Sequence, residues 1–426
     1  MNFISIEEAL KKKSGEVSIR GWVYRVRKMK DKIFIVMRDS SDIIQCVLKT
    51  PALVEEGDEL LLESSLELEG KLNEDKRAPG GYELEVSKMN IIHLSQDFPI
   101  GRDQSPEFLL DQRHLYIRSR KMTAIMKIRS TVTGAIHEYF RSKGFYEFQS
   151  PIMVQGGAED GPTMFEVKYF GRKMFLAQTW QLYAEAAMFG LEKLYCIAPS
   201  FRAEKSKTSR HLTEFWHAEM EVAWCNLDGL MDYAEEMIKF VLKKVLKDNK
   251  KELKLLDRDI EKLKPSIEKK FPRITYDDAL EMLSKKGRKI KWGKDLRTIE
   301  EERLMDSYDT VVFVTHYPKE VMAFYKPRDP KNPKVAMCFD ALGPESIGEL
   351  IGGSERDTDI KELVKSLEEL GEDVENYRYY LDTRKYGSIP HAGFGLGTER
   401  LIRWICGLDS VKDAIGFPRT LQRTNP

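Results

Sequence analysis

The sequence predicts an α+β protein, with a small N-terminal β-barrel followed by a larger domain built on a mainly antiparallel sheet. Three observations predict this fold class. Residues 1–93 contain several short segments in which apolar and polar side chains alternate, as they do in half-buried strands. Later strand-like segments mostly follow one another without a crossover helix, which favours antiparallel pairing. Helical segments with apolar residues at spacings of three and four lie between them.

The first 93 residues are expected to form the barrel. Strands are predicted at 17–27, 32–39 and 43–49, and near 59–71 and 82–94. Five strands in so short a chain make the OB-fold the leading candidate. Basic side chains such as Arg27 accompany Phe34 and Gln45, and cations beside an aromatic ring suit a single-stranded nucleic acid. An equally good interpretation at this stage is that Phe34 belongs to the core and the cations are solvated.

A polar connector at 94–116, containing Pro99, Gly101 and Pro106, is expected to act as a hinge. The domain at 117–426 then begins with an amphipathic helix over 121–140 that ends at Gly144. The Lys-rich residues 243–270 are interpreted as a solvated helical insertion. Strands are predicted at 165–178, 193–199, 214–225, 310–325, 335–343 and 346–353, and helices at 181–190, 227–247, 276–285, 358–371 and 397–407.

Composition limits the function classes. The 426 residues carry 69 Lys and Arg against 69 Asp and Glu, so any nucleic acid must be bound by local basic patches. No apolar run is long enough to span a membrane, and the N-terminus lacks the apolar core of a secretory signal. The five cysteines occur singly, which argues against a zinc site and favours a reducing, cytoplasmic location.

The segment 201–221 carries the densest group of chemically useful residues. A predicted hairpin places Phe215, His217, Glu219 and Glu221 on one face of its second strand. If that face were solvent, the acids would be ordinary surface charges and Trp216 would belong to the opposite, core-facing side. The alternative is a binding site, in which arginines flanking the loop clamp phosphates and an aromatic ring stacks on a base.

Two further clusters follow. Asp340 and Glu349 lie on predicted strands joined by a short turn, so their carboxylates could meet and hold Mg²⁺ together with nucleotide phosphates. The glycines of 393–400 suit a strand that approaches other atoms closely and then turns into a helix, and a tight packing contact would explain them equally well.

Together, these three clusters resemble the signature motifs of the class II aminoacyl-tRNA synthetases. The helix leading to 144–151 resembles the first motif, a dimer element that ends in proline; 201–221 resembles the second and 393–400 the third. With an N-terminal OB-like domain, the arrangement is similar to subclass IIb, whose members activate Asp, Asn or Lys. The resemblance covers essentially the whole chain and implies a homodimer formed through 117–151.

Among subclass IIb members, the asparaginyl enzymes of archaea and bacteria are the most similar. Aspartyl enzymes carry a lysine that neutralises the substrate carboxylate, and Ala184 takes that position here. A carboxamide instead needs one donor for its oxygen and one acceptor for its NH₂ group. Arg356 is the expected donor and Glu219 the expected acceptor. The implied substrates are therefore L-asparagine, ATP and tRNA(Asn).

The resemblance also implies a role for each site residue. Arg202 and Arg400 are the expected catalytic residues, and Asp340 and Glu349 the expected Mg²⁺ ligands. Arg27, Phe34 and Gln45 are expected to contact the anticodon. ATP is expected to contact Arg202, Glu204, Arg210, His211, Phe215, Glu349 and Arg400, and the amino acid is expected to contact Glu159, Gln181, Glu219, Ser354 and Arg356.

Three rival functions remain open at this point. They are an aspartyl enzyme of relaxed tRNA specificity, an asparagine-synthetase-like amide ligase, and an RNA-binding relative without catalytic activity. Ala184 disfavours the first, the barrel domain the second, and the complete set of expected catalytic side chains the third. Departures from the family pattern at Thr398 and Gly416 remove no catalytic side chain.

Overall fold

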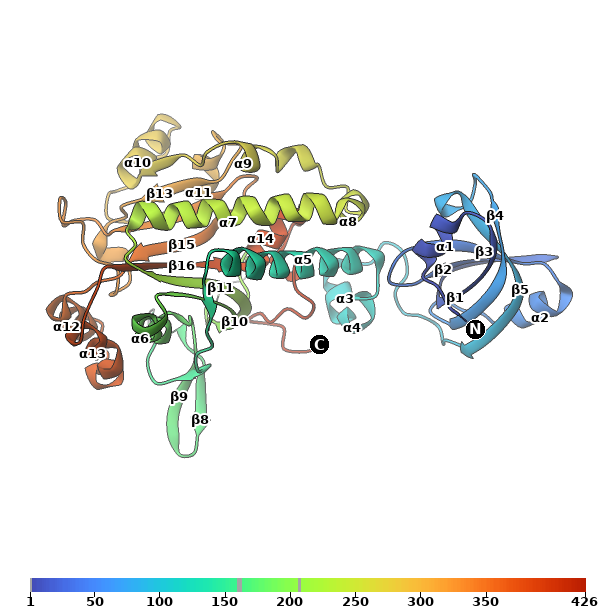
Figure 1. Ribbon diagram of the computed structural model, residues 1–426, viewed down its shortest axis with the longest axis horizontal. Coiled ribbons are helices and arrows are strands. Elements are labelled where there is room, and N and C mark those ends of the chain that lie inside the picture. The colour runs from blue at the N-terminus through green and yellow to red at the C-terminus, as the bar shows by residue number, and fades with distance from the viewer. Residues whose placement is uncertain (1, 159–162, 206–207) are drawn as a thin grey trace. The chain divides into compact units, whose positions relative to one another are not determined.

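A computed structural model describes residues 2–158, 163–205 and 208–426 (Figure 1). The chain divides into two compact units, residues 1–116 and 117–426. Each unit has its own hydrophobic core. The α+β fold class is confirmed.

The first unit contains a closed five-stranded barrel with the strand order β1-β2-β3-β5-β4. Ile19, Ile35 and Leu68 are fully buried inside it. Neighbouring strands pair antiparallel, except β3 and β5, which pair parallel. The elements of this unit are α1 (Ile6–Lys12), β1 (Gly15–Met29), β2 (Lys32–Arg38), β3 (Ile43–Leu48), α2 (Pro51–Gly57), β4 (Ser65–Glu74), β5 (Tyr82–His93), α3 (Pro106–Asp111) and α4 (Arg113–Tyr116).

The strand predicted near 59–71 is wrong in its first half. A helix, α2, precedes it, and β4 begins only at Ser65. Thr50 accepts a hydrogen bond from the Leu53 N–H and Pro51 occupies the first helical position, which is a typical helix start.

The second unit is built on an eight-stranded sheet with the order β12-β13-β14-β15-β16-β11-β10-β6. The pairs β12–β13 and β10–β6 at its two edges are parallel, and the interior pairs are antiparallel. A smaller sheet has the order β7-β9-β8. The strands are β6 (Tyr146–Glu147), β7 (Met153–Val154), β8 (Glu166–Tyr169), β9 (Arg172–Leu176), β10 (Lys193–Phe201), β11 (Glu214–Ala223), β12 (Arg273–Thr275), β13 (Val312–Thr315), β14 (Cys338–Gly343), β15 (Gly348–Glu355) and β16 (His391–Gly397).

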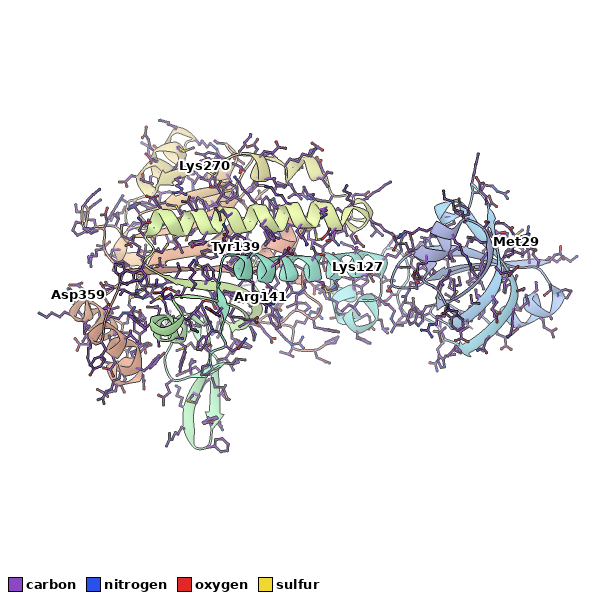
Figure 2. The ribbon with its side chains drawn as sticks, in the orientation of Figure 1. Met29, Lys127, Tyr139, Arg141, Lys270 and Asp359 are labelled. Atoms are coloured by element: carbon purple, nitrogen blue, oxygen red, sulfur yellow. The ribbon has the colours of Figure 1, made fainter. Side chains whose placement is uncertain are left out.

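Two long helices support this sheet. α7 packs across β14, β15 and β16, and α5 packs beside α7 (Figure 1). Tyr139 of α5 points toward α7, where its hydroxyl lies 3.1 Å from the Tyr233 carbonyl oxygen (Figure 2). The helices of this unit are α5 (Arg120–Ser142), α6 (Gln181–Leu191), α7 (Leu227–Asp248), α8 (Lys250–Leu255), α9 (Pro265–Glu268), α10 (Tyr276–Lys285), α11 (Thr298–Met305), α12 (Ile360–Glu369), α13 (Arg378–Lys385) and α14 (Thr398–Cys406).

Two predicted strands of this unit need correction. The strand at 165–178 is a hairpin, β8–β9, because Phe170 and Gly171 both take positive φ angles and reverse the chain. The strand at 310–325 is only β13, which ends before His316, a residue with φ of 59°. Pro318 follows and cannot donate a hydrogen bond to a sheet.

No helix in the part of the chain that the structure describes is both long and apolar enough to cross a membrane. All five cysteines are unpaired there.

Candidate active site

The strand β11 carries the predicted row of polar side chains into the interior of the protein. His217, Glu219 and Glu221 are 9%, 4% and 1% exposed, so the interpretation of this face as solvated surface is wrong. β11 lies inside the sheet between β10 and β16, and its polar face borders two cavities. On the opposite face Ala218, Met220 and Val222 are buried, whereas Trp216 is 39% exposed and does not belong to the core.

The glycines of β16 make room for this row. Gly393 pairs with Glu221 and Gly395 with Glu219 in the sheet. A Cβ at Gly395 would overlap the ring of His217, and a Cβ at Gly393 would overlap the carboxylate of Glu221. The predicted close approach is therefore present, and it brings the polar side chains of β11 up against the backbone of β16.

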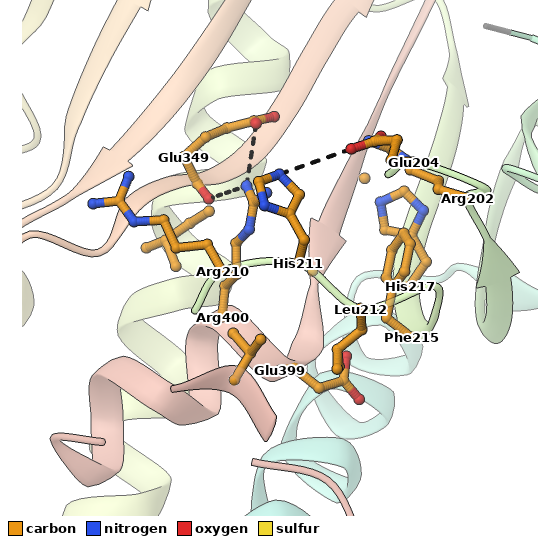
Figure 3. Close-up of a pocket in the computed structure, with 14 residues that line it drawn as sticks. Arg202, Glu204, Arg210, His211, Leu212, Phe215, His217, Glu349, Glu399 and Arg400 are labelled. Carbon is orange, nitrogen blue, oxygen red and sulfur yellow. Dashed lines mark hydrogen bonds and ion pairs between the residues drawn. The ribbon is translucent and has the colours of Figure 1, made fainter. Parts of the chain in front are cut away.

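One cavity collects the residues expected to contact ATP. It is lined by residues of β11, β15, β16 and the start of α14, and by the loop that joins β10 to β11 (Figure 3). Its wall also contains His217 and Glu399, which the sequence did not single out for ATP. The seven predicted residues that line it are Arg202, Glu204, Arg210, His211, Phe215, Glu349 and Arg400.

Two polar contacts cross this cavity (Figure 3). Arg400 Nη1 donates to the Glu349 carbonyl oxygen at 2.7 Å and lies 3.2 Å from its carboxylate. His211 Nε2 lies 3.9 Å from the Glu204 carboxylate. Burial, together with the positive charge of Arg400, lowers the pKa of His211, which keeps the imidazole neutral at neutral pH.

Arg210 is paired with acidic residues that no sequence pattern singled out. Its guanidinium lies 3.3 Å from Glu301 and 2.6 Å from Glu302, and it donates to the Ser346 carbonyl oxygen at 2.6 Å. Burial and then repulsion by Glu349 raise the pKa of Glu301 to about 7. A phosphate that binds Arg210 must therefore compete with these carboxylates.

Arg202 and Glu349 connect this cavity to a second one. Both residues line both cavities, so the two spaces share a wall. The Arg202 guanidinium also lies 5.5 Å from the centroid of the Phe215 ring, within the range of a cation–π contact. A ligand carboxylate in one cavity and a phosphate in the other can therefore reach the same cation.

The second cavity contains the side chains expected to bind the amino acid. Gln181, Glu219 and Arg356 all line it. The Glu219 carboxylate accepts hydrogen bonds from the Thr179 hydroxyl and, at 2.9 Å, from the Trp180 N–H. Burial raises the pKa of Glu219 to about 7 against the effect of these donors.

Arg356 is fixed in this cavity by partners behind it. Its guanidinium pairs with Glu221, with Nε 3.2 Å from the carboxylate, and donates from Nη1 to the Ser354 hydroxyl at 2.7 Å. Ser354 is fully buried and supports the arginine from the sheet. Burial opposes the charge of Arg356, but Glu221 raises its pKa above the ordinary value.

Glu185, on α6, contacts two of the side chains that line the cavity. Its carboxylate accepts a hydrogen bond from Gln181 Nε2 at 2.9 Å and lies 3.9 Å from Arg356. It also pairs with Arg384 and lies 3.1 Å from His391 Nε2. Burial opposes its ionisation, but Arg384 and His391 hold the pKa of Glu185 below the usual range.

Asp340 and Glu349 come together as the sequence predicts. Their carboxylates both approach Gly352, and both line the second cavity. Burial and then repulsion by Glu349 raise the pKa of Asp340 well above its ordinary value. Against the effect of burial, Arg400 and Arg202 hold the pKa of Glu349 below its ordinary value. No set of three or more His, Cys, Asp or Glu suited to a metal occurs among the described residues, so a metal here needs further ligand oxygens.

The barrel presents a groove of its own. Arg27, Phe34 and Gln45 all line it, and the Gln45 amide donates to Glu83 at 2.7 Å. Phe34 is only half-buried and alternates with the buried Ile33 and Ile35 (1% and 0% exposed). The interpretation of Phe34 as a core residue is therefore wrong.

Of the predicted site residues, only Glu159 lies outside the described residues. The cavity-lining residues that sequence reasoning missed include Asp295, Lys326 and His217. Glu185, Glu301 and Arg384, which lie outside the lining of both cavities, were also missed. His217 stood in the predicted row beside Glu219, so its position in the sequence was the one available signal.

The geometry agrees with comparisons to known proteins. Residues 105–421 match the family model of class II tRNA synthetases for D, K and N, and residues 17–92 match that of the OB-fold nucleic acid binding domain. The chain belongs to the class II tRNA synthetases. The synthetase is therefore an ATP-using ligase that joins an amino acid to tRNA.

Known relatives match the synthetase over nearly its whole length. The asparagine–tRNA ligases of Thermoplasma acidophilum and Thermococcus kodakarensis are each 46% identical, with 96% of both chains covered. The asparaginyl-tRNA synthetase of Pyrococcus horikoshii, solved with asparaginyl-adenylate, superimposes with a TM-score of 0.96 at 43% identity over all of both chains. The Entamoeba histolytica enzyme with the same adenylate gives 0.88 at 30% identity over 97% of each chain.

Proposed function

We propose that the synthetase activates L-asparagine with ATP and transfers it to tRNA(Asn). The observation that carries the specificity is that Arg356 and Glu219 line one cavity, whereas Ala184, at the position of the aspartyl enzymes' lysine, is buried in α6. Arg356 donates to the side-chain oxygen of asparagine, and Glu219 accepts from its NH₂ group. An aspartate would place a carboxylate against Glu219 without a compensating cation.

ATP occupies the first cavity in this proposal. Its adenine lies between Phe215 and Arg400, with Glu204 near the base. Arg210 and His211 reach the β- and γ-phosphates after Arg210 exchanges its acidic partners. Support comes from the fact that all five side chains line the same cavity.

Arg202, in the wall that the two cavities share, holds both the α-phosphate and the carboxylate of asparagine. Gln181 and Glu159 hold the substrate ammonium, and Ser354 steadies Arg356. A carboxylate oxygen then attacks the α-phosphorus, the bond to pyrophosphate breaks, and asparaginyl-adenylate forms. A ribose hydroxyl at the end of the tRNA next attacks the acyl carbon, and AMP leaves. Catalysis rests on positioning and on stabilisation of developing charge.

Asp340 and Glu349 would hold Mg²⁺, because a half-buried pair of carboxyl groups beside a phosphate site suits a hard divalent cation. Bound there, Mg²⁺ supplies positive charge to the phosphates of ATP.

The barrel reads the anticodon: Phe34 stacks on a base, and Arg27 and Gln45 add contacts. The active form is a homodimer through residues 117–151, a region that exposes the large apolar side chain of Tyr146, which is 60% accessible. The place of action is the cytoplasm, which suits five unpaired cysteines.

The test is ATP–pyrophosphate exchange with asparagine and with aspartate, each with and without tRNA. Exchange with asparagine in the absence of tRNA, at least about a hundredfold above exchange with aspartate, is expected because a buried charge mismatch costs several kcal/mol. Preference for aspartate would overturn the proposed specificity. Ammonia-dependent formation of free asparagine would indicate an amide ligase instead.

A further inference from the structure

The connection between α10 and α11 is the most cationic stretch of the second unit that the proposed chemistry does not use (Figure 1). We call residues 285–297 the basic segment. Seven of its 13 residues are cationic and one is acidic, in a chain whose net charge is zero. The cations are Lys285, Lys286, Arg288, Lys289, Lys291, Lys294 and Arg297.

Four of these cations have partners among the described residues. Arg288 and Arg297 both pair with the buried Glu300, at 2.6 and 3.0 Å. Lys285 pairs with Glu281 at 2.6 Å, and Lys286 donates to the Arg303 carbonyl oxygen at 2.5 Å. These contacts give the segment a fixed path along the surface.

The other three cations, Lys289, Lys291 and Lys294, are exposed. Among residues 2–158, 163–205 and 208–426, no carboxylate pairs with them. Ile290, between Lys289 and Lys291, packs against a core cluster that also contains Leu296, two residues after Lys294, and this packing turns the lysines outward. Unpaired cations held at such short intervals attract a polyanion with phosphates along its backbone.

An aromatic ring lies among the three lysines. Trp292 is 38% exposed, and its indole N–H donates to Asp277 at 2.9 Å. Its ring also contacts Tyr276 edge-on at 6.4 Å. A fixed, partly exposed indole between cations is a surface on which an unpaired base can stack.

The basic segment runs to the active site. Asp295, directly after Lys294, lines the second cavity together with Arg356 and Glu349. A polyanion that follows the lysines therefore ends beside the cavity in which the amino acid is activated. The partner that must bring one end to this cavity is the tRNA, because its terminal ribose receives the amino acid.

We propose that the basic segment is the docking surface for the acceptor arm of the tRNA, with Lys289, Lys291 and Lys294 contacting phosphates and Trp292 contacting a base. This inference rests on the proposed function, since it assigns the partner of the same active site. It adds an RNA-binding surface on the second unit to the anticodon groove of the barrel.

The test uses the full-length triple variant K289Q/K291Q/K294Q. Asparagine-dependent pyrophosphate exchange is expected to match the parent, because this first step needs no RNA. The KM for tRNA(Asn) in aminoacylation is expected to rise, and the slope of log KM against log salt to fall by about 1 for each lysine that contacts a phosphate. Phosphorothioate footprinting is expected to lose protection in the acceptor stem and keep it in the anticodon loop.

The matched control is K243Q/K247Q/K250Q, which removes three exposed lysines from α7 and α8. The control is expected to keep the parental KM, salt slope and footprint. An unchanged KM and footprint in the basic-segment variant would overturn the inference. This is the result expected if the three lysines bind an acidic protein instead of tRNA. Equal effects in both variants would overturn it as well. Absence of asparagine-dependent exchange in the parent would refute the proposed function instead, so the two failures are distinguishable.

Discussion

At the scale of single residues, the role proposed for Glu219 makes its protonation state decisive for the binding of asparagine. Burial raises its pKa to about 7, and only the ionised carboxylate is a pure acceptor for the NH₂ group of asparagine. The kcat/KM for asparagine in pyrophosphate exchange should therefore rise as the pH increases through about 7, whereas the KM for ATP should follow a different profile. The measurement is a pH series of exchange rates.

Glu219→Gln supplies the comparison for this pH series. It keeps the shape of the side chain but cannot titrate, so its kcat/KM for asparagine should be lower and should lose the rise near pH 7. Its discrimination against aspartate should fall by at least about tenfold, since the repelling charge is gone. A parental pH profile in this variant would assign the rise to another group, such as Glu221.

Glu185 should matter both to stability and to substrate binding. Glu185→Gln leaves Arg384 buried without a full charge partner and should lower the free energy of unfolding by about 3 kcal/mol or more. The double variant E185Q/R384Q removes both charges and should recover part of that loss in denaturant unfolding.

The KM for asparagine in these two variants shows whether Glu185 positions the binding residues or only stabilises the fold. In both, Gln181 and Arg356 lack their shared carboxylate, so the KM for asparagine should stay raised while the KM for ATP stays near the parental value. Recovery of the asparagine KM in the double variant would mean that Glu185 acts on stability alone.

Site residues could be predicted from the sequence where they lie at a regular spacing along one strand. The alternation along 215–221 placed those side chains on one face correctly, but which face met solvent depended on the neighbouring strands. The partners of Arg210 and Arg356 were not predictable. Glu301 lies 91 residues from Arg210 and Glu221 lies 135 from Arg356, and no local period connects residues that only the sheet brings together.

At the scale of elements, β16 depends on having no side chain at Gly393. A Cβ there would overlap both the Glu221 carboxylate and the Met220 carbonyl oxygen, and the backbone of a central strand cannot move aside cheaply. Gly393→Ala should therefore lower the free energy of unfolding by about 1–3 kcal/mol. The measurement is denaturant unfolding of the full chain.

Gly190→Ala is the matched control for this change. Nothing lies within 4 Å of a Cβ at Gly190, which sits in helix α6, so alanine should be neutral or stabilise by up to about 1 kcal/mol. Equal unfolding midpoints for the two variants would contradict the crowding argument.

The boundaries of helices and strands show which sequence patterns predict an element well and which do not. The helices predicted at 276–285 and 358–371 were confirmed because capping residues and apolar spacing agree. The strand predicted at 310–325 was too long, since its apolar residues beyond Thr315 pack from a loop rather than from a sheet. Apolar content alone indicates burial and not extended pairing.

At the scale of the whole molecule, tRNA binding by the barrel and amino-acid activation by the second unit should be separable. Phe34→Ala in the barrel groove should weaken tRNA binding by about 1–3 kcal/mol, the value of one stacked base, and should leave tRNA-independent pyrophosphate exchange unchanged. Trp22→Ala, an exposed aromatic of the same barrel outside the residues that line this groove, should bind tRNA like the parent. Filter binding and exchange assays on both variants check this, and a loss of exchange in Phe34→Ala would contradict the separation.

The wall that Arg202 and Glu349 provide to both cavities has a thermodynamic consequence. Whatever occupies one cavity alters the field and the side-chain positions that the other ligand meets, so the two affinities are linked. Linkage is reciprocal: if nucleotide tightens asparagine by some factor, asparagine must tighten nucleotide by the same factor. If that factor is greater than one, the enzyme favours the ternary complex over either form with a single ligand, which limits unproductive occupancy when one substrate is scarce.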